Sequence, residues 1–308
     1  MPELPEVEVV RAGLEPAVRG ATVLGVEVLD ERALTRHALG AVDFERRLTG
    51  RRIRAAARRG KFLWLPLDPR DVTDADAPEA VVGHLGMSGQ LLLRDSGAPR
   101  ERHERIRLSI AHPDHGDLAV VFADQRTFGS LALDVLEPTP DGRAGGRGAD
   151  EPLVPGQVAH IARDPLDPAF DDRAFRAALR RKRVDVKRVL LDQTVVSGVG
   201  NIYADEALWA ARIHPETTAS LLATRTVHRL LAEVRTVLTK ALAEGGTSFD
   251  AQYVNVNGQA GYFAHSLNAY GRTGAPCPRC GTPLVRVSFT NRSSHFCPRC
   301  QKQQRSLS

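Results

Sequence analysis

The four cysteines of the chain form two Cys-x-x-Cys pairs, Cys277/Cys280 and Cys297/Cys300, separated by 16 residues. Each pair can direct two thiolates at one ion, and the alternating segment 284–289 can form a short hairpin that brings the pairs together. Four thiolates complete a tetrahedral site and leave no position for water, which indicates one structural zinc ion (Zn²⁺). Two disulfides are the alternative, and a reducing cytosol disfavours them. A redox motif fits less well, because neither pair lies in a βα context.

Length and composition favour a two-domain globular protein. The chain has 308 residues, of which 42% are hydrophobic and 26% are charged. No uncharged apolar run approaches the roughly 20 residues that would span a bilayer. The first residues lack the basic flank and apolar stretch of a secretory signal. We therefore expect a cytoplasmic protein with no membrane partner.

Positive charge is concentrated in two stretches. The net charge is +5, yet residues 271–308 alone carry seven Arg or Lys and no acid, and residues 173–188 carry eight against the single acid Asp185. Either stretch by itself is compatible with an ordinary solvated surface. Two such stretches near a metal module favour a nucleic-acid partner.

Hydrophobic periodicity divides the chain into a strand-rich and a helical part. Residues 5–18 predict a helix that starts at a proline. Short β-type runs then predict an antiparallel sandwich or barrel, at 21–29, 62–67, 90–93, 106–110, 118–122 and 130–135. A Gly/Pro-rich stretch that begins at residue 137 predicts a flexible connection. Beyond it, helical periodicity marks 173–191, 201–212 and 221–243.

The segment Gly198-Val199-Gly200-Asn201 predicts a tight turn between two helices. Glycines there let the backbone approach a phosphate, and the first amides of the next helix can hold it while Asn201 adds a side-chain donor. Such turns also join helices without any ligand. The basic stretch just before this turn favours phosphate binding.

Several motifs, in order along nearly the whole chain, carry a family resemblance. They are Pro2-Glu3-Leu4-Pro5-Glu6-Val7-Glu8, Arg58-Arg59-Gly60-Lys61-Phe62, His84-Leu85-Gly86-Met87-Ser88-Gly89, Gly198-Val199-Gly200-Asn201-Ile202-Tyr203-Ala204, Gly261-Tyr262-Phe263, Tyr270-Gly271-Arg272 and the cysteine pairs. The chain resembles the bacterial formamidopyrimidine-DNA glycosylases, a family that also contains endonuclease VIII. The resemblance implies a bifunctional enzyme of base-excision repair that removes oxidised purines and then nicks the abasic strand.

Patterns and resemblance together predict an α+β fold in four parts. These are an N-terminal antiparallel β-sandwich with a flanking helix (1–136), a flexible linker (137–160), a helical DNA-binding domain with a helix-two-turn-helix motif and a lesion-capping loop (161–265), and a four-cysteine β-hairpin zinc finger (266–303). The expected partner is damaged double-stranded DNA. We expect a monomer in the bacterial cytoplasm, associated with the nucleoid when bound to DNA, and the sequence implies no organic cofactor.

The resemblance assigns catalytic roles to five residues. Pro2, once the initiator methionine is removed, offers a secondary amine that attacks C1′ and forms a Schiff base. Glu3 is the general acid/base, and Glu6 is an orienting, proton-relay carboxylate. Lys61 contacts the phosphate that flanks the lesion and donates a proton in β-elimination. Arg292, at the tip of the finger, binds phosphate and assists δ-elimination.

The resemblance also assigns DNA contacts. Met87 fills the void that an everted nucleotide leaves, Arg126 pairs with the orphaned base, and Phe128 is the aromatic wedge beside it. The remaining expected contacts are His103, Lys182, Asn201 and Lys187. Without the resemblance, base rates would make Met87 and Phe128 core residues.

Three features of the chain depart from the family pattern, and two others bear on its branch. Thr127 stands where a second arginine is common, Asp164 stands where a glutamate is usual, and the linker is longer than expected. Leu4 and the long segment 248–263 favour the oxidised-purine branch. The alternatives are an endonuclease VIII-like activity on oxidised pyrimidines and a non-catalytic protein that binds damaged DNA.

Overall fold

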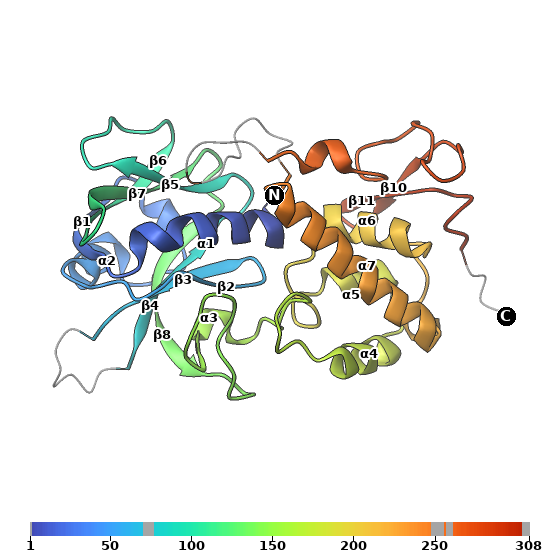
Figure 1. Ribbon diagram of the computed structural model, residues 1–308, viewed down its shortest axis with the longest axis horizontal. Coiled ribbons are helices and arrows are strands. Elements are labelled where there is room, and N and C mark those ends of the chain that lie inside the picture. The colour runs from blue at the N-terminus through green and yellow to red at the C-terminus, as the bar shows by residue number, and fades with distance from the viewer. Residues whose placement is uncertain (1, 70–76, 248–255, 257–260, 304–308) are drawn as a thin grey trace. The chain divides into compact units, whose positions relative to one another are not determined.

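The computed structural model describes residues 2–69, 77–247, 256 and 261–303 (Figure 1). The chain divides into two compact units, Met1–His160 with Gly245–Gly261, and Ile161–Glu244 with Tyr262–Ser308. The first unit is mainly antiparallel strands and the second mainly helices with one β-hairpin, so the predicted α+β class is confirmed. Among the described residues, no helix combines the length and apolarity needed to cross a bilayer.

The N-terminal unit is a sandwich of two antiparallel sheets. One sheet has the order β1-β6-β7-β5 and the other β2-β3-β4-β8-β9. Strand β6 alternates buried and half-buried residues along its length, as a strand with one face on a core does. The strands are β1 (Thr22–Val28), β2 (Ala57–Arg59), β3 (Phe62–Pro66), β4 (Glu79–His84), β5 (Gly89–Asp95), β6 (Glu104–His112), β7 (Gly116–Asp124), β8 (Ser130–Pro138) and β9 (Leu153–Pro155). All six predicted strand segments are strands, whereas β2, β4 and β9 are additions.

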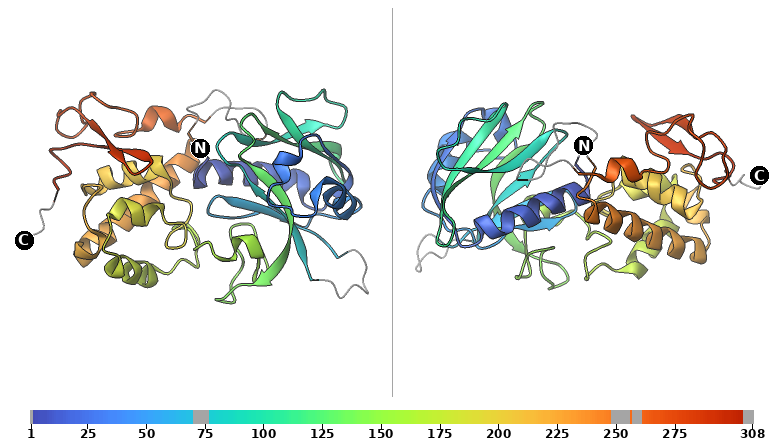
Figure 2. Two further views of the ribbon diagram at one scale, coloured as in Figure 1. Left: turned by 180° about the vertical axis from the view of Figure 1, so that it is seen from behind. Right: turned by 45° about the horizontal axis from the view of Figure 1, so that its top comes forward.

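Helix α1 (Leu4–Val18) lies against the sheets and contributes to the same core (Figures 1 and 2). Its start is fixed by a capping box, in which Glu3 is the N-cap and the Glu6 carboxylate accepts from the Glu3 amide. Val7, Val10 and Leu14 form its buried stripe, which confirms the predicted helix. The unit also contains η1 (Glu31–Leu34), α2 (Gly40–Leu48) and α3 (Gly156–Ala159), none of them predicted.

The segment predicted as a flexible linker, 137–160, is folded as part of the N-terminal unit. Strand β9 pairs with β8, and Arg147 exchanges two backbone hydrogen bonds with Arg58. A Cβ added to Gly145 or Gly146 would lie 1.9 or 2.2 Å from a backbone oxygen of a neighbouring segment. The glycines therefore serve close backbone packing here and not flexibility. Gly245, Gly246, Thr247, Val256 and Gly261, expected in the helical domain, also belong to the N-terminal unit. Most of the expected lesion-capping loop, 248–255 and 257–260, lies outside the described residues.

The C-terminal unit packs short helices around α6. Its elements are α4 (Asp172–Arg181), α5 (Val186–Leu191), α6 (Asn201–Ala211), η2 (Ala219–Leu221), α7 (Thr224–Ala243), η3 (Phe263–Ser266), β10 (Val285–Phe289) and β11 (Arg292–Phe296). The prediction of a single helix over 173–191 was wrong, because the segment forms two helices, α4 and α5. It breaks at Lys182–Asp185, where Val186 donates its amide to the Thr217 carbonyl and Asp185 forms a bridge with Thr218.

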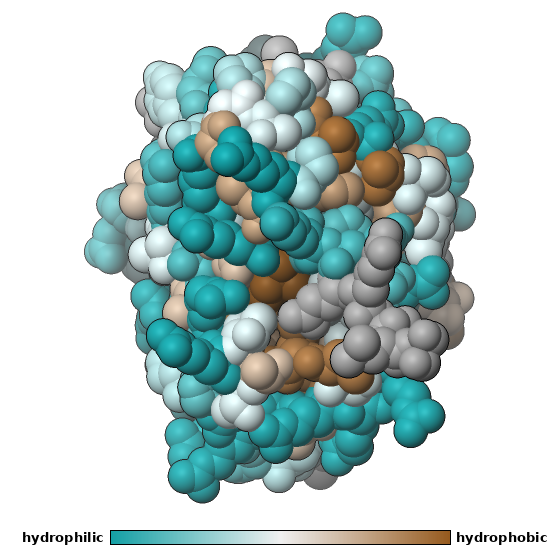
Figure 3. Space-filling view, turned by 90° about the vertical axis from the view of Figure 1, so that its right-hand side faces the viewer, coloured by the Kyte–Doolittle hydropathy of each residue, from teal (hydrophilic) through white to brown (hydrophobic). Residues whose placement is uncertain are grey.

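The surface of the C-terminal unit that faces the viewer in Figure 3 is mostly hydrophilic, with small separate apolar patches. Most of the predicted basic residues on α4, on α5 and in the finger are exposed. Their exposure fits the electrostatic footprint of a polyanion partner.

Candidate active site and nucleic-acid interface

The start of α1 holds two buried carboxylates within four residues of Pro2. Glu3 and Glu6 are each 2% exposed. One oxygen of Glu6 accepts from the Glu3 amide at 2.8 Å, and the other accepts from the amide and hydroxyl of Thr247 at 2.7 and 2.6 Å. Gly246 has a φ of +83° and packs on Glu6, with its ideal Cβ 3.1 Å from that carboxylate. Three donors thus fix the Glu6 carboxylate in one orientation.

Thr247 is a site residue that the sequence analysis missed. It follows α7 in a Gly245-Gly246-Thr247 turn, and it is buried. The available signal was this glycine pair directly after a helical segment. Its contact with Glu6, 241 positions earlier in the chain, has no local signature.

Lys61 lies in the turn between β2 and β3, where Gly60 has a φ of +57°. Phe62 beside it contacts the ring of His84, with centroids 4.7 Å apart, and Arg36 lies over the same phenyl ring at 5.3 Å. Burial, followed by the charges of Arg36 and Lys61, lowers the pKa of His84 to about 4. The imidazole is therefore neutral at pH 7, and the charges of Arg36 and Lys61 make the local field positive.

Two loops bring Met87, Arg126 and Phe128 together. Met87 follows β4, and the other two residues follow β7. The Arg126 guanidinium lies 3.7 Å from the Met87 sulfur and 5.6 Å from the Phe128 ring centroid. Met87 is 42% exposed and Phe128 is 61% exposed. Two large apolar side chains held at the surface beside an arginine suit insertion into a base stack.

Asp124 organises these loops and was not anticipated from the sequence. Its carboxylate, 1% exposed, accepts from the Ser88 hydroxyl at 2.6 Å and from the amides of Arg126 and Gly129 at 3.0 and 2.8 Å. Thr127, the departure from the family pattern, has a φ of +54°, a strained conformation for a β-branched residue. Buried hydrogen bonds to Asp124 thus fix the conformation of this loop, and the backbone preferences of its residues do not.

His103 lies next to the same aspartate and has a φ of +63°. Its carbonyl accepts from the Asp124 amide at 2.9 Å. A cavity of about 250 Å³ opens here, and Ser88, Gln90, Arg94 and Asp124 are among its lining residues. His103 is half-buried and lies beside the loop that carries Arg126.

In the C-terminal unit, the glycine turn joins α5 to α6 as predicted. Gly200 is the N-cap of α6 and Asn201 is its first residue. The Gln193 side chain holds the turn: its oxygen accepts from the Gly198 amide at 2.9 Å, and its nitrogen donates to the Val199 carbonyl at 2.9 Å. Lys182 is part-exposed and pairs with Asp192 at 2.9 Å.

Lys187 requires a correction. It was expected to contact DNA, but its side chain is 0% exposed and its Nζ lies 2.6 Å from an Asp205 oxygen. The same nitrogen donates to the Ser293 carbonyl at 2.8 Å and to the Ser294 hydroxyl at 2.9 Å. The other Asp205 oxygen accepts from the His295 amide at 2.9 Å. This buried pair ties the finger hairpin to α5 and α6, and it leaves Lys187, which was expected near the lesion, no exposed surface for contact with DNA.

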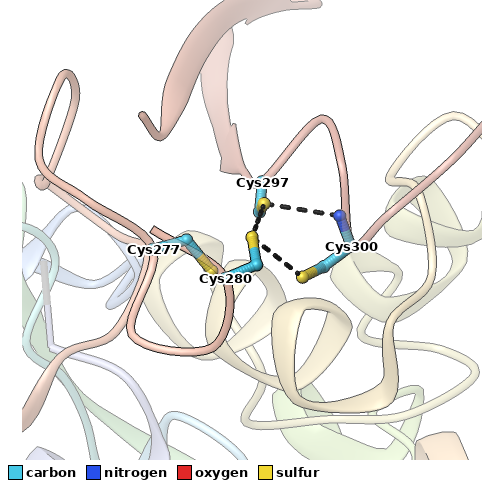
Figure 4. Close-up of side chains that lie close together, drawn as sticks. All are labelled: Cys277, Cys280, Cys297 and Cys300. Atoms are coloured by element: carbon cyan, nitrogen blue, oxygen red, sulfur yellow. Dashed lines mark hydrogen bonds between the residues drawn. The ribbon is translucent and has the colours of Figure 1, made fainter. Parts of the chain in front are cut away.

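The four cysteines converge as a metal site (Figure 4). Their ligand atoms lie within 4.8 Å of one another, and Cys280 Sγ is 3.5 Å from that of Cys297 and 3.4 Å from that of Cys300. Four Zn–S bonds of about 2.3 Å place tetrahedral sulfurs about 3.8 Å apart, close to these distances. All four cysteines are free, so the disulfide alternative is excluded for this structure.

The finger presents Arg292 at its tip. Arg292 is exposed and begins β11, directly after the turn at Thr290, where φ is +53°. The base of the finger is anchored by Arg279, whose guanidinium donates to the Trp209 carbonyl at 2.6 Å and lies 3.8 Å from that indole ring. Anchored base and exposed tip suit a finger that offers a cation to phosphate.

Three family models cover the chain in order. They are the formamidopyrimidine-DNA glycosylase N-terminal domain (residues 1–131), the formamidopyrimidine-DNA glycosylase H2TH domain (161–252) and the zinc finger found in FPG and IleRS (274–303). This combination defines a class of zinc-finger DNA glycosylases of base-excision repair. Within that class, the chain belongs to the formamidopyrimidine-DNA glycosylase family.

Individual relatives match over the full length. The formamidopyrimidine-DNA glycosylase of Leifsonia xyli subsp. xyli is 64% identical over 98% of this chain and 100% of its own. That of Streptomyces avermitilis is 56% identical, with 99% of each covered. Among solved structures, Lactococcus lactis Fpg in complex with DNA that contains an abasic site superposes with a TM-score of 0.78 at 32% identity, over 98% of this chain and 100% of that one.

Proposed function

We propose that this protein excises oxidised purines, 8-oxoguanine and formamidopyrimidines, from double-stranded DNA and then cleaves the abasic strand by β,δ-elimination, as a bifunctional DNA glycosylase and AP lyase. The observation that carries the proposal is the pair of buried carboxylates, Glu3 and Glu6, within four residues of Pro2 at the start of α1. A secondary amine beside organised acids is what imine-forming catalysis requires. Structures of Lactococcus lactis Fpg with DNA that contains an abasic site or Fapy-dG support the substrate class.

In this proposal, the Pro2 nitrogen attacks C1′ of the damaged nucleotide after removal of the initiator methionine. The bond between C1′ and the base breaks, and its electron pair leaves with the base. The Pro2 nitrogen then loses its proton, and its lone pair expels the ring oxygen as the C1′–O4′ bond breaks, which gives the iminium. Glu3 protonates the sugar ring oxygen and shuttles protons as the iminium forms. Glu6, held by the Glu3 amide and Thr247, orients this proton transfer. The iminium acidifies C2′, whose proton is lost as the 3′ phosphate leaves, and a second elimination releases the 5′ phosphate.

The remaining residues bind DNA or support its binding. Met87, Arg126 and Phe128 replace the stacking that is lost when the damaged nucleotide leaves the duplex. Lys61, His103, Lys182, Asn201 and Arg292 contact phosphates, and Lys61 also donates a proton in β-elimination. Zinc, bound by the four cysteines, supplies no chemistry and folds the finger that carries Arg292. We propose a monomer that acts in the bacterial cytoplasm, at the nucleoid when bound to DNA.

Incision assays test this function. Duplexes that carry 8-oxoguanine opposite cytosine, formamidopyrimidine opposite cytosine or thymine glycol opposite adenine are incubated with the protein, and the ends of the products are analysed. The proposal predicts faster incision of both purine lesions, with phosphate at both ends of the gap. Faster incision of thymine glycol would indicate the endonuclease VIII-like activity. Tight binding without incision of any duplex would refute catalysis and leave a damage-binding protein.

A further inference from the structure

One carboxylate of α1 lies between two arginines. Glu8 pairs with Arg11 at 2.9 Å and with Arg58 at 2.8 Å, and the three side chains are 12%, 11% and 3% exposed. Arg147 lies 3.9 Å from the same carboxylate. Burial acts to raise the pKa of Glu8, but the hydrogen bond from Arg11 and the charge of Arg58 outweigh it and hold the pKa below its ordinary value. Glu8 is therefore an ionised carboxylate within a largely buried cluster of arginines.

The cluster joins α1 to β2. Arg11 reaches across from α1 and donates to the Ala56 carbonyl at 3.2 Å, just before β2 begins. Arg58 belongs to β2, and its backbone pairs with that of Arg147 through hydrogen bonds of 2.8 and 2.9 Å. Its neighbour Arg59 donates to the Gly145 carbonyl at 2.7 Å. Strand β2 is thus hydrogen-bonded to β3 along one edge and to the segment 145–147 along the other, and the side chains of Glu8 and Arg11 connect it to α1.

Strand β2 is followed directly by the turn that contains Lys61. Arg59 is opposite Phe62 in the β2–β3 register, so Gly60 and Lys61 form the two-residue turn between them. Fixing Arg58 and Arg59 therefore fixes the backbone that carries Lys61. The other end of the connection is α1, a single rigid helix that starts beside Pro2 and Glu3.

We propose that Glu8 is a positioning residue of the lyase reaction, which aligns the Lys61 turn with the catalytic start of α1 through Arg58. The inference rests on the proposed function, in which Pro2 and Lys61 act on the same abasic nucleotide. Displacement of a catalytic group by about 1 Å can cost up to about 100-fold in rate, so loss of this connection should slow elimination by about tenfold or more. DNA affinity should change little, because Glu8 itself is proposed to contact no phosphate.

The test uses two variants of the full zinc-loaded protein. Glu8→Gln removes the carboxylate charge. Glu8→Gln/Arg58→Gln also removes the guanidinium of Arg58, so that this arginine is not left buried without its partner, while Arg11 keeps Glu15 at 3.9 Å. β-Elimination is measured under single-turnover conditions on duplex with a preformed abasic site. Affinity is measured on duplex that carries a tetrahydrofuran analogue, which cannot be cleaved. We expect both variants to eliminate about tenfold more slowly, with Kd within about threefold of the parent.

Glu15→Gln is the matched control. Glu15 lies on the same helix, accepts from the Ala56 amide next to β2 and pairs with Arg19. It also lies 3.9 Å from Arg11, but it has no ion pair with Arg58 among the described contacts and is two turns farther from Glu3. It should leave elimination unchanged. In a Lys61→Ala background, Glu8→Gln should slow elimination by less than about twofold, because its effect acts through Lys61.

Unchanged elimination in both Glu8 variants would overturn the proposal. So would an equal loss with and without Lys61, or a loss matched by Glu15→Gln, since either would indicate a general effect on stability. If the parent protein eliminates but Lys61→Ala does so equally well, the positioning role is refuted while Schiff-base chemistry stands. A parent protein that neither eliminates nor forms a borohydride-trapped adduct would refute the proposed function and this role with it.

Discussion

The buried Lys187–Asp205 pair should dominate the stability of the C-terminal unit. In Asp205→Asn the ammonium stays fully buried and keeps its contacts with Ser293 and Ser294, but it loses the carboxylate 2.6 Å away. Breaking one partner of such a pair costs about 3–5 kcal/mol. The new amide oxygen can still accept from the His295 amide, so the cost arises mainly from the uncompensated charge. With about 2–4 °C of melting temperature per kcal/mol, the expected fall is on the order of 10 °C.

Lys187→Met/Asp205→Asn separates charge from packing. Because the unpaired charge is gone, the double variant should be more stable than Asp205→Asn alone by at least about 1 kcal/mol, although it carries one more substitution. Urea unfolding followed by circular dichroism measures the free energies. A cost below about 1 kcal/mol for Asp205→Asn, or additive losses in the double variant, would refute this reasoning.

DNA binding by Lys187→Met provides an independent check of the buried role. Loss of one phosphate contact lowers the slope of log K against log salt by about one. Because Lys187 is fully buried, its replacement should leave the slope at the parent value. A slope reduced by about one would mean that the lysine leaves the aspartate and binds DNA after all.

Three further predictions concern other parts of the molecule. The pKa of His84 is about 4 in the folded state and about 6.5 in the unfolded state, so the unfolded chain binds the proton first as pH falls. The free energy of unfolding should therefore drop by about 3 kcal/mol between pH 6.5 and pH 4. In urea unfolding, His84→Asn should flatten this pH dependence. Gly86→Ala should lower the free energy of unfolding by about 2–3 kcal/mol in the same assay, because φ of Gly86 is +60° and the added Cβ would lie 2.5 Å from the Gly129 amide. A loss below about 0.5 kcal/mol would contradict the packing of the loops that carry Gly86 and Gly129. Metal analysis should find one zinc per chain, and Cys280→Ser should lower both zinc content and DNA affinity; full affinity without zinc would contradict its structural role.

Local patterns predicted much of the fold. The apolar stripe of α1, the short alternating strands and the cysteine spacing each depend on residues close in sequence, and each was confirmed. The break between α4 and α5 was missed because it has no proline or glycine and depends on Thr217 and Thr218, more than 30 positions away. The folded segment 137–160 was missed because glycines that permit close packing and glycines that permit flexibility look alike in sequence.

At the candidate site, too, features set by local sequence were predicted and features set by distant contacts were not. The resemblance supplied the residues proposed to meet DNA or substrate, whereas the residues that hold them in place came only from the structure. Thr247 on Glu6, Asp124 on Ser88 and Asp205 on Lys187 act between residues 241, 36 and 18 positions apart in the chain. Burial of Lys187 could not be predicted, because a lysine in a basic stretch is usually solvated and only its tertiary partners reverse that expectation.

The central claim is that the terminal amine of Pro2 is the nucleophile. The most direct measurement is borohydride trapping on duplex DNA with 8-oxoguanine opposite cytosine, followed by peptide mapping of the adduct by mass spectrometry. The claim predicts a covalent adduct on the N-terminal Pro2 peptide, strongly reduced in Pro2→Gly although that variant still binds tetrahydrofuran duplex. An adduct on a lysine peptide, or no adduct despite tight binding, would contradict it.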